Sequence, residues 1–211
     1  MIAEQYLDRI IETYTTGKYE QQVRHAKGEF FKLTGVVFEN DPFFEERMDL
    51  FLEWYLFTRP LDNHDMPPVK LFYLEGEKKF NHEERDVYFG LTQILHSLFQ
   101  LKKIKKNIFY LKDFFMDKAV QVCVTDTLTL SCGDIFEARL IPYQGKYYFG
   151  KGFCYHSPQT KTFIEQRIKK IKHLDETFKQ KLLLDLASMR LKHDRYPHID
   201  LKHIYSLDSK I

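Results

Sequence analysis

The hydrophobic period of this chain changes near residue 97, and this change constrains the fold more than any other feature. Before it, apolar side chains recur every three or four positions, which is typical of amphipathic helices. After it, apolar and polar side chains alternate in short runs rich in β-branched and aromatic residues. We therefore expect an α+β protein in which a helical unit precedes a β-rich unit.

Start and stop signals divide the helical half into separate helices. Asp41-Pro42 is a favourable start for a helix that contains a wide apolar stripe, because Asp caps free N–H groups and Pro tolerates the first turn. Asn81, with Glu84 three residues later, predicts a capping box that opens a helix running to about His96. The remaining stop signals are Gly17, Gly35 and Pro60.

Five short strands are expected between residues 97 and 156, separated by turn-like segments such as residues 143–146. So many short strands in so few residues predict a small closed barrel of SH3-like or OB-like type. Ser157-Pro158 then starts the C-terminal helices. The expected units are a helical unit (1–96), the barrel (97–156), C-terminal helices (157–196) and a tail (197–211). Without a polar linker between them, we expect one compact body.

Charge is also divided along the chain. Residues 1–100 carry 18 acidic and 11 basic side chains, whereas residues 101–211 carry 12 acidic and 21 basic ones. The total of +2 therefore hides a net charge of −7 in the first part and +9 in the second. Such a dipole favours an anionic partner or head-to-tail self-association, unless the two parts pack on each other and neutralise it.

Two groups of basic residues are candidates for contacts with phosphate groups. The neighbouring aromatic residues 147–149 are candidates for stacking on single-stranded bases. The alternative interpretation, which we favour, is a solvated basic face. The first group is Lys102, Lys103, Lys105 and Lys106, extended by Arg139, Lys146 and Lys151, and the second is Arg167, Lys169, Lys170 and Lys172.

Trp54 and Arg59 are candidates for a contact with a protein partner, because Trp and Arg are enriched among residues that dominate binding energy. Trp54 is the only Trp of the chain and lies beside Glu53 on the apolar third helix. The alternative interpretation, favoured for Trp54, is packing against the neighbouring part of the same molecule.

No catalytic or nucleotide-binding motif of any specificity is present in the sequence. Gly150-Lys151-Gly152 lacks the spacing of a phosphate-binding loop, and Cys154 and His156 alternate without a neighbouring acid to orient them. We therefore expect no catalytic residue, no metal and no cofactor, and favour a protein that is not an enzyme. Two histidine- or acid-rich segments were rejected as metal sites on their spacing, residues 62–65 and 193–203.

The composition and cysteine usage favour a cytoplasmic protein. The N-terminus has no signal-peptide pattern, and no apolar run approaches the length of a membrane span. Cys123, Cys132 and Cys154 are odd in number and lack the CxxC spacing, so we expect reduced thiols.

Several strings in the middle of the chain resemble those of a known protein family. They are FLEWYLFTRPL at residues 51–61, PVKLF at 68–72 and HSLF at 96–99, with GD at 133–134 and ARLIP at 138–142. This combination resembles an uncharacterised family of deltaproteobacterial proteins. Some relatives carry a Cys-rich SEC-C zinc tail, which this sequence lacks. The resemblance implies no established activity and assigns no functional residues.

The sequence thus favours a cytoplasmic adaptor or regulatory protein that binds another protein without catalysing a reaction. The alternative is a nucleic-acid-binding module that uses the basic barrel face and the basic C-terminal helix.

Overall fold

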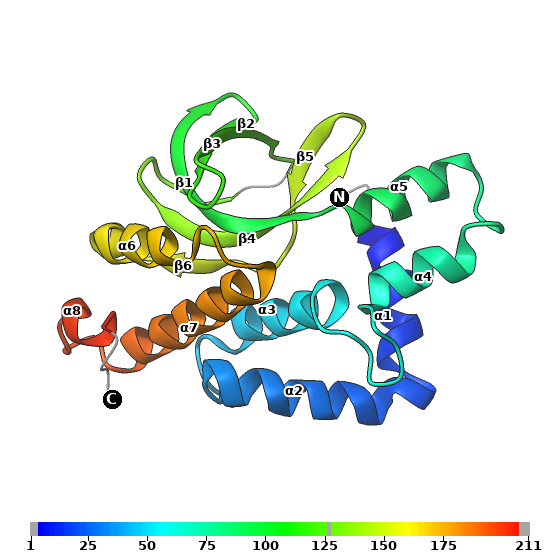
Figure 1. The fold of residues 1–211 in the computed structure, drawn as a ribbon, viewed down its shortest axis with the longest axis horizontal. Helices are drawn as coiled ribbons and strands as arrows, with labels where there is room; N and C mark the ends of the chain where they lie inside the picture. Colours follow the sequence, from blue (N-terminus) through cyan, green and yellow to red (C-terminus); the bar gives the residue numbers. More distant parts are fainter. Residues whose placement is uncertain (1–3, 126–127, 207–211) are drawn as a thin grey trace.

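The computed structural model describes residues 4–125 and 128–206, and it confirms the α+β class (Figure 1). The elements before the barrel are α1 (Glu4–Thr15), η1 (Gly17–Tyr19), α2 (Glu20–Thr34), α3 (Phe44–Phe57), α4 (Pro68–Gly76) and α5 (His82–Thr92). The strands are β1 (Leu95–Lys105), β2 (Ile108–Asp113), β3 (Lys118–Cys123), β4 (Ile135–Tyr143), β5 (Lys146–Phe149) and β6 (Cys154–His156). The last elements are η2 (Pro158–Thr160), α6 (Lys161–Ile171), α7 (Glu176–Arg195) and α8 (Leu201–Ile204).

The barrel closes through five strands in the order β1-β2-β3-β5-β4, with β4 returning to β1. All of these pairings are antiparallel except the parallel pair β3–β5. That parallel pair has only two residue pairs, Val122 with Tyr147 and Cys123 with Tyr148. We call this short closure the seam. The short β6 pairs with β4 beyond β5, so β5 and β6 share one edge of β4.

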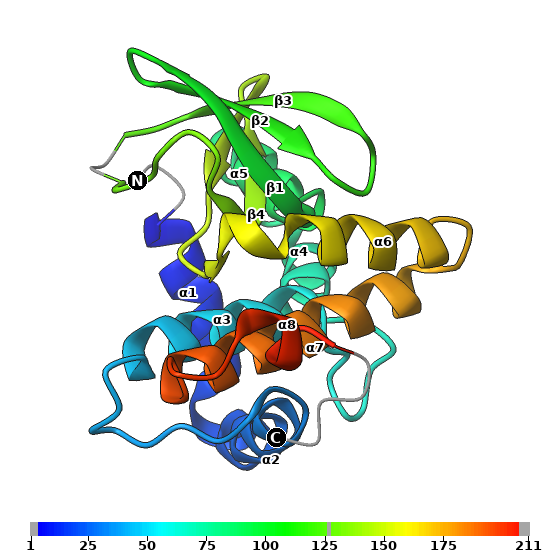
Figure 2. The same ribbon diagram turned by 90° about the vertical axis from the view of Figure 1, so that its left-hand side faces the viewer.

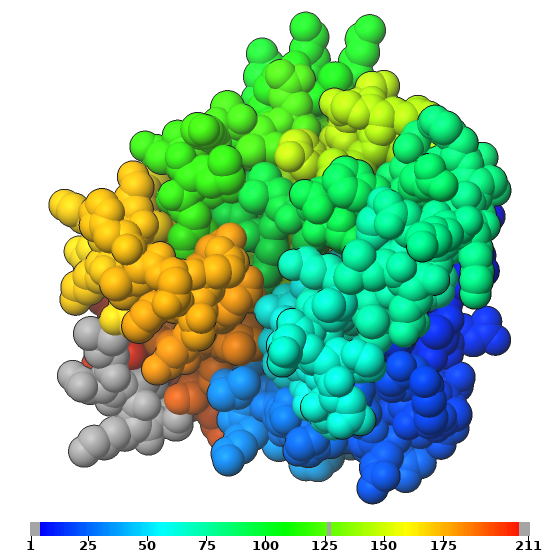
Figure 3. Space-filling model, turned by 45° about the vertical axis from the view of Figure 1, so that its right-hand side comes forward, coloured from blue at the N-terminus to red at the C-terminus, as the bar shows by residue number. Residues whose placement is uncertain are grey.

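Strand β4 is buried on both faces because it lies between the barrel interior and the helices. Phe136, Ala138 and Leu140 belong to the barrel core, whereas the alternate residues Glu137 and Arg139 face away from it. Figure 3 shows the barrel resting directly on the helical part of the molecule, without an intervening linker. Charged residues of β4 are therefore enclosed at this junction.

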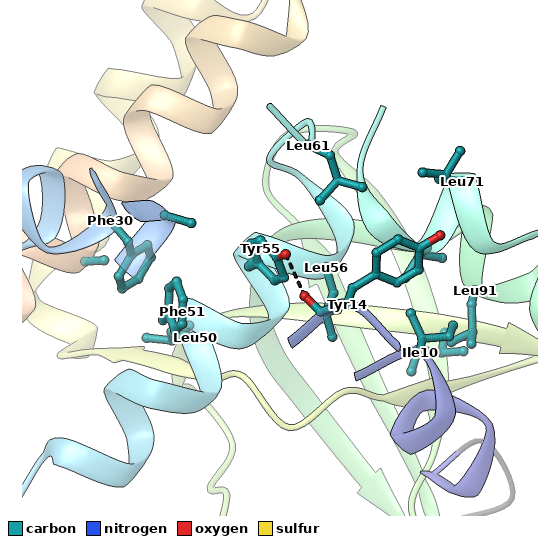
Figure 4. Close-up of a cluster of buried hydrophobic side chains, with 14 of the residues drawn as sticks. Ile10, Tyr14, Phe30, Leu50, Phe51, Tyr55, Leu56, Leu61, Leu71 and Leu91 are labelled. Carbon is teal, nitrogen blue, oxygen red and sulfur yellow. Dashed lines mark hydrogen bonds between the residues drawn. The ribbon is translucent and has the colours of Figure 1, made fainter. Parts of the chain in front are cut away.

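Helix α3 lies at the centre of the helical unit and is packed on several sides. Phe51, Tyr55 and Leu56 are each at most 2 % exposed. The hydroxyl of Tyr55 donates a hydrogen bond to the backbone oxygen of Tyr14 at 2.8 Å, which ties α3 to the end of α1 (Figure 4). The wide apolar stripe that the sequence showed here is thus a surface covered by neighbouring helices.

Helix boundaries differ from the prediction at two places. Helix α3 begins at Phe44 rather than at Asp41-Pro42, because the Asp41 carboxylate accepts from the backbone N–H of Phe38 instead of capping the helix. The capping box of Asn81 and Glu84 is confirmed, but α5 ends at Thr92. His96 therefore belongs to β1, where the prediction placed it at a helix end.

The C-terminal segment packs on the helices that follow the barrel. Figure 2 shows α6, α7 and α8 gathered on one side of the molecule. Ile204 and Tyr205 are buried at 0 % and 5 % exposure, so this part of the predicted tail (197–211) docks. The last predicted tail residues, 207–211, lie outside the described residues.

Candidate functional site

Arg139 and Glu53 form a buried ion pair where the barrel meets α3. Nη1 of Arg139 lies 3.5 Å from Oε2 of Glu53, and Nη2 donates to the hydroxyl of Thr58 at 3.1 Å. Arg139 is only 1 % exposed. The expectation that Arg139 extends an exposed basic surface is therefore wrong, because its guanidinium is buried and paired with the Glu53 carboxylate.

The loop after β5 encloses the Glu53 carboxylate. Oε1 of Glu53 accepts from the backbone N–H of Lys151 at 2.7 Å, and the N–H of Gly152 also stabilises the carboxylate. A Cβ atom at Gly150 would lie 2.2 Å from Oε1, so only glycine allows this approach. The Gly-Lys-Gly segment is thus a cradle for a carboxylate of the same chain. Even so, burial raises the pKa of Glu53 above its ordinary value.

His96 and Glu137 form a second buried contact beside this pair. Nε2 of His96 donates to Oε1 of Glu137 at 2.7 Å, and Nδ1 accepts from the amide of Gln180 on α7 at 3.4 Å. This arrangement fits a neutral imidazole, and burial lowers the pKa of His96 to about 4. Burial alone would raise the pKa of Glu137, but the hydrogen bond from His96 and the charge of Arg139 hold it below its ordinary value.

Cys154 and His156 are both buried and lie two positions apart on β6, whereas Tyr155 between them packs against the barrel core. The hydroxyl of Tyr205 donates to Nδ1 of His156 at 2.9 Å, and burial lowers the pKa of His156 to about 4. Burial raises the pKa of Cys154, which is 0 % exposed. Cys154 is therefore a buried thiol that is held in its protonated form.

Arg59 and Trp54 stabilise the helical unit. Arg59 donates to Glu29 on α2 at 2.5 Å and to Asp62 at 2.6 Å, so it fastens the loop after α3 to α2. Trp54 packs its ring 5.5 Å from that of Phe30. These contacts pack Arg59 and Trp54 within the helical unit, and a role of either residue in partner binding stays a prediction.

Lys105 of the first predicted basic group and Lys172 of the second lie toward opposite ends of β2. Lys105 pairs with Ile108 at one end, whereas the turn at the other end follows Asp113 and places Asp117 within the electrostatic influence of Lys172. The six-residue strand spans roughly 17 Å. The lysines of the β1–β2 hairpin and Lys172 are therefore on separate surfaces. The exposed members are Lys102, Lys103, Lys105, Lys106, Lys146, Lys151, Lys169, Lys170 and Lys172, with Arg167 half-buried.

A pocket of about 570 Å³ opens beside the seam. We call it the seam pocket. Phe149, Phe153 and Tyr155 line one side as a continuous aromatic wall, with ring centroids 5.2 Å apart for the first two and 5.7 Å for the stacked second pair. The other lining residues are Glu46, Asp49, Cys123, Val124, Thr125, Leu128, Tyr148, Gly150 and Lys151.

Two carboxylates from α3 reach the seam pocket. Glu46 and Asp49 lie three residues apart, which places them on one face of the helix. Within the described part of the chain, neither side chain forms a hydrogen bond or an ion pair. Partial burial raises the pKa of both carboxyl groups, and this is offset only partly by Arg190 at Glu46 and by Lys151 at Asp49. The pocket therefore combines aromatic walls with two acids that lack a fixed partner.

These functional features differ in how visible they are in the sequence. Glu53 interrupts the apolar stripe of α3, and Glu137 and Arg139 interrupt an apolar strand, so a buried ion pair was detectable. Glu46 and Asp49 carry no such signal, because carboxylates are common on exposed helix faces. Neither the buried ion pair nor the two pocket carboxylates were predicted from the sequence.

Residues 4–125 and 128–206 contain no group of three or more His, Cys, Asp or Glu placed to hold a metal ion. Among the same residues, no helix is both long and apolar enough to cross a membrane.

The fold and pocket define an α+β protein in which helices frame a small closed barrel with a ligand-sized opening at its seam. The chain belongs to DUF7986, a family of unknown function, whose model matches residues 5–182. This confirms the expected membership of an uncharacterised family, while the deltaproteobacterial origin and the zinc tails of relatives stay predictions. No curated protein and no solved structure matches the chain.

Proposed function

We propose that this protein is a non-enzymatic adaptor or regulatory protein of the cytoplasm that binds another protein at the seam pocket. The observation that carries the proposal is the pocket itself, with its aromatic wall and two carboxylates that form no hydrogen bond or ion pair with the residues the structure describes. Its volume of about 570 Å³ lies within the range of roughly 300–1,000 Å³ typical of ligand sites.

The surrounding structure supports a fixed binding surface. Glu53 anchors the loop at Gly150–Gly152, and Arg190 donates to the backbone oxygen of Tyr155 at 2.6 Å, so both ends of the aromatic wall are held from outside the barrel. A preorganised wall loses little conformational entropy when a partner binds. The helices thus support the pocket in addition to covering the barrel.

Affinity capture from the cells that produce the protein tests the proposal. The wild-type chain is compared with Val124→Trp, which places an indole in the pocket, and captured proteins are quantified by mass spectrometry. We expect at least one protein to be retained by the wild type and lost by Val124→Trp. A captured set that is identical for the two chains would refute the seam pocket as the docking site.

Two controls separate docking from misfolding and from charge. Alkylating Cys123 with a bulky maleimide in a Cys132→Ser chain fills the pocket of an already folded protein. The second control replaces the exposed hairpin lysines together, which tests the nucleic-acid alternative with the same samples and with single-stranded DNA and RNA. Its substitutions are Lys102→Gln, Lys103→Gln, Lys105→Gln and Lys106→Gln.

A further inference from the structure

We propose that the seam pocket binds an arginine or lysine side chain from an extended segment of the partner, with Glu46 and Asp49 receiving the cationic group and Phe153 and Tyr155 contacting its aliphatic stem. This inference rests on the proposed function and names the chemistry of the partner. It follows from the combination of walls, charges and strand geometry in one pocket.

The charges of the pocket select a cation. Glu46 acts electrostatically on Tyr155, which places this carboxylate at the aromatic wall. Asp49 lies three residues further along α3. Together with Lys151, it lines both the seam pocket and a smaller pocket beside α1. Arg190 and Lys151 offset the charges of Glu46 and Asp49 only in part, and the pKa of both carboxyl groups stays raised. A guanidinium or ammonium group between the two carboxylates neutralises charges that have no ion-pair partner among the described residues.

The aromatic wall selects a side chain with an apolar stem. Phe153 and Tyr155 stack almost parallel, with an angle of 7° between their rings. Such a surface accommodates methylene groups by burial and attracts a nearby cation through the ring faces. An inorganic cation has no methylene groups to bury against this wall, whereas a basic amino-acid side chain uses both the wall and the carboxylates.

The strand geometry favours an extended segment. Beyond the two residue pairs of the seam, Val124 on one side and Tyr155 on the other both line the pocket. Among the described strands, β6 pairs only with β4. A partner segment that enters the pocket beside the seam therefore runs between the end of β3 and strand β6. A peptide in extended conformation presents alternate side chains to such a site.

Protection of Cys123 measures this binding directly, because this free thiol lines the pocket. The full chain with Cys132→Ser is treated with iodoacetamide, and alkylation of Cys123 is followed by mass spectrometry. The probe is a capped five-residue peptide with a central arginine between alanine and valine residues. The same peptide with citrulline, which is neutral and almost the same shape, is the matched ligand control.

We expect the arginine peptide to slow alkylation of Cys123 at concentrations at least about tenfold below those needed by the citrulline peptide. Glu46→Gln with Asp49→Asn should abolish this difference. Glu45→Gln removes one charge from an exposed position on the same helix outside the pocket, and it should leave the difference intact.

Equal protection by the two peptides, or protection by neither, overturns the cation inference. Shifts in the NMR signals of the Asp49 and Tyr155 amides, recorded with both peptides, provide a second readout that does not depend on thiol reactivity. The proposed function has a separate test: partner capture that is lost in Val124→Trp supports docking at the pocket even when the arginine peptide fails.

Discussion

At the scale of single residues, we expect the stability of the fold to depend strongly on the buried ion pair of Arg139 and Glu53. Arg139→Met leaves the Glu53 carboxylate buried and without its cation, which should lower the free energy of unfolding by about 3–5 kcal/mol. Combining Arg139→Met with Glu53→Gln should cost less than the sum of the single changes, because the second change removes the stranded charge. Urea unfolding of the three variants measures the coupling, and strictly additive effects would contradict the pairing.

Two histidines predict how stability depends on pH. His96 and His156 each have a folded-state pKa of about 4, against an ordinary value of 6.5. The unfolded chain therefore binds protons that the folded chain does not, so stability is complete above pH 6.5 and falls as the pH drops toward 4. Between pH 7 and pH 5, each histidine should lower the free energy of unfolding by about 2 kcal/mol.

Urea unfolding at several pH values, for the wild type and for His96→Gln, measures this dependence. The variant lacks one of the two groups, so its stability should fall less steeply over the same interval. Equal slopes for the two proteins would show that His96 is not held neutral in the folded state.

At the scale of single elements, the loop between β5 and β6 depends on the absence of side chains. Gly150→Ala places a Cβ 2.2 Å from Oε1 of Glu53, so either the carboxylate or the loop must move. We expect a loss of about 2–4 kcal/mol, as for other buried steric conflicts. Gly28→Ala is the matched control, because a Cβ there meets nothing within 4 Å on α2 and should stabilise the helix by about 0.5–1 kcal/mol. Thermal or urea unfolding distinguishes these opposite signs, and a neutral Gly150→Ala would contradict the cradle.

Much of this element structure could be predicted from the sequence, because local signals determine it. The Asn81 capping box and the β-branched alternation of β3 are formed by neighbouring residues and appear where they were expected. The start of α3 and the end of α5 were displaced, because Asp41 bonds to Phe38 and Arg195, and β1 recruits residues from Leu95 onward. Contacts distant in sequence decided these boundaries.

The seam pocket could not be predicted in the same way. Its acids come from α3, its aromatic wall from residues 149–155 and its far side from the end of β3, so it exists only after the barrel closes. The Gly-Lys-Gly segment shows the same limit. In the sequence, this segment could be compared only with a phosphate-binding loop. In the structure, the segment binds the carboxylate of Glu53, which lies almost a hundred positions earlier in the chain.

At the scale of the whole molecule, two ion pairs among the described residues join the acidic and basic parts of the chain. Arg139 with Glu53 and Arg195 with Asp41 each join the basic part to the acidic part. These contacts neutralise some of the charge division, while the lysines of the β1–β2 hairpin stay exposed. The dipole is thus partly internal and partly a surface property.

The same junction predicts that the molecule unfolds as one body. Trp54 fluorescence reports on the helical unit, whereas far-UV circular dichroism reports on all elements together. Because buried polar contacts and apolar clusters cross between helices and barrel, both signals should change at the same urea concentration. Two separate transitions would show that the barrel and the helical unit are independent domains.

The most direct test of the central claim is site-specific photocrosslinking from the seam pocket in living cells. A photoreactive phenylalanine analogue replaces Val124 in the pocket or, as the control, Gln144 in the exposed turn between β4 and β5. We expect a discrete protein adduct from position 124 that is absent from position 144 and that disappears with Glu46→Gln and Asp49→Asn. Identical adducts from both positions, or none from position 124, would contradict a protein partner at the seam.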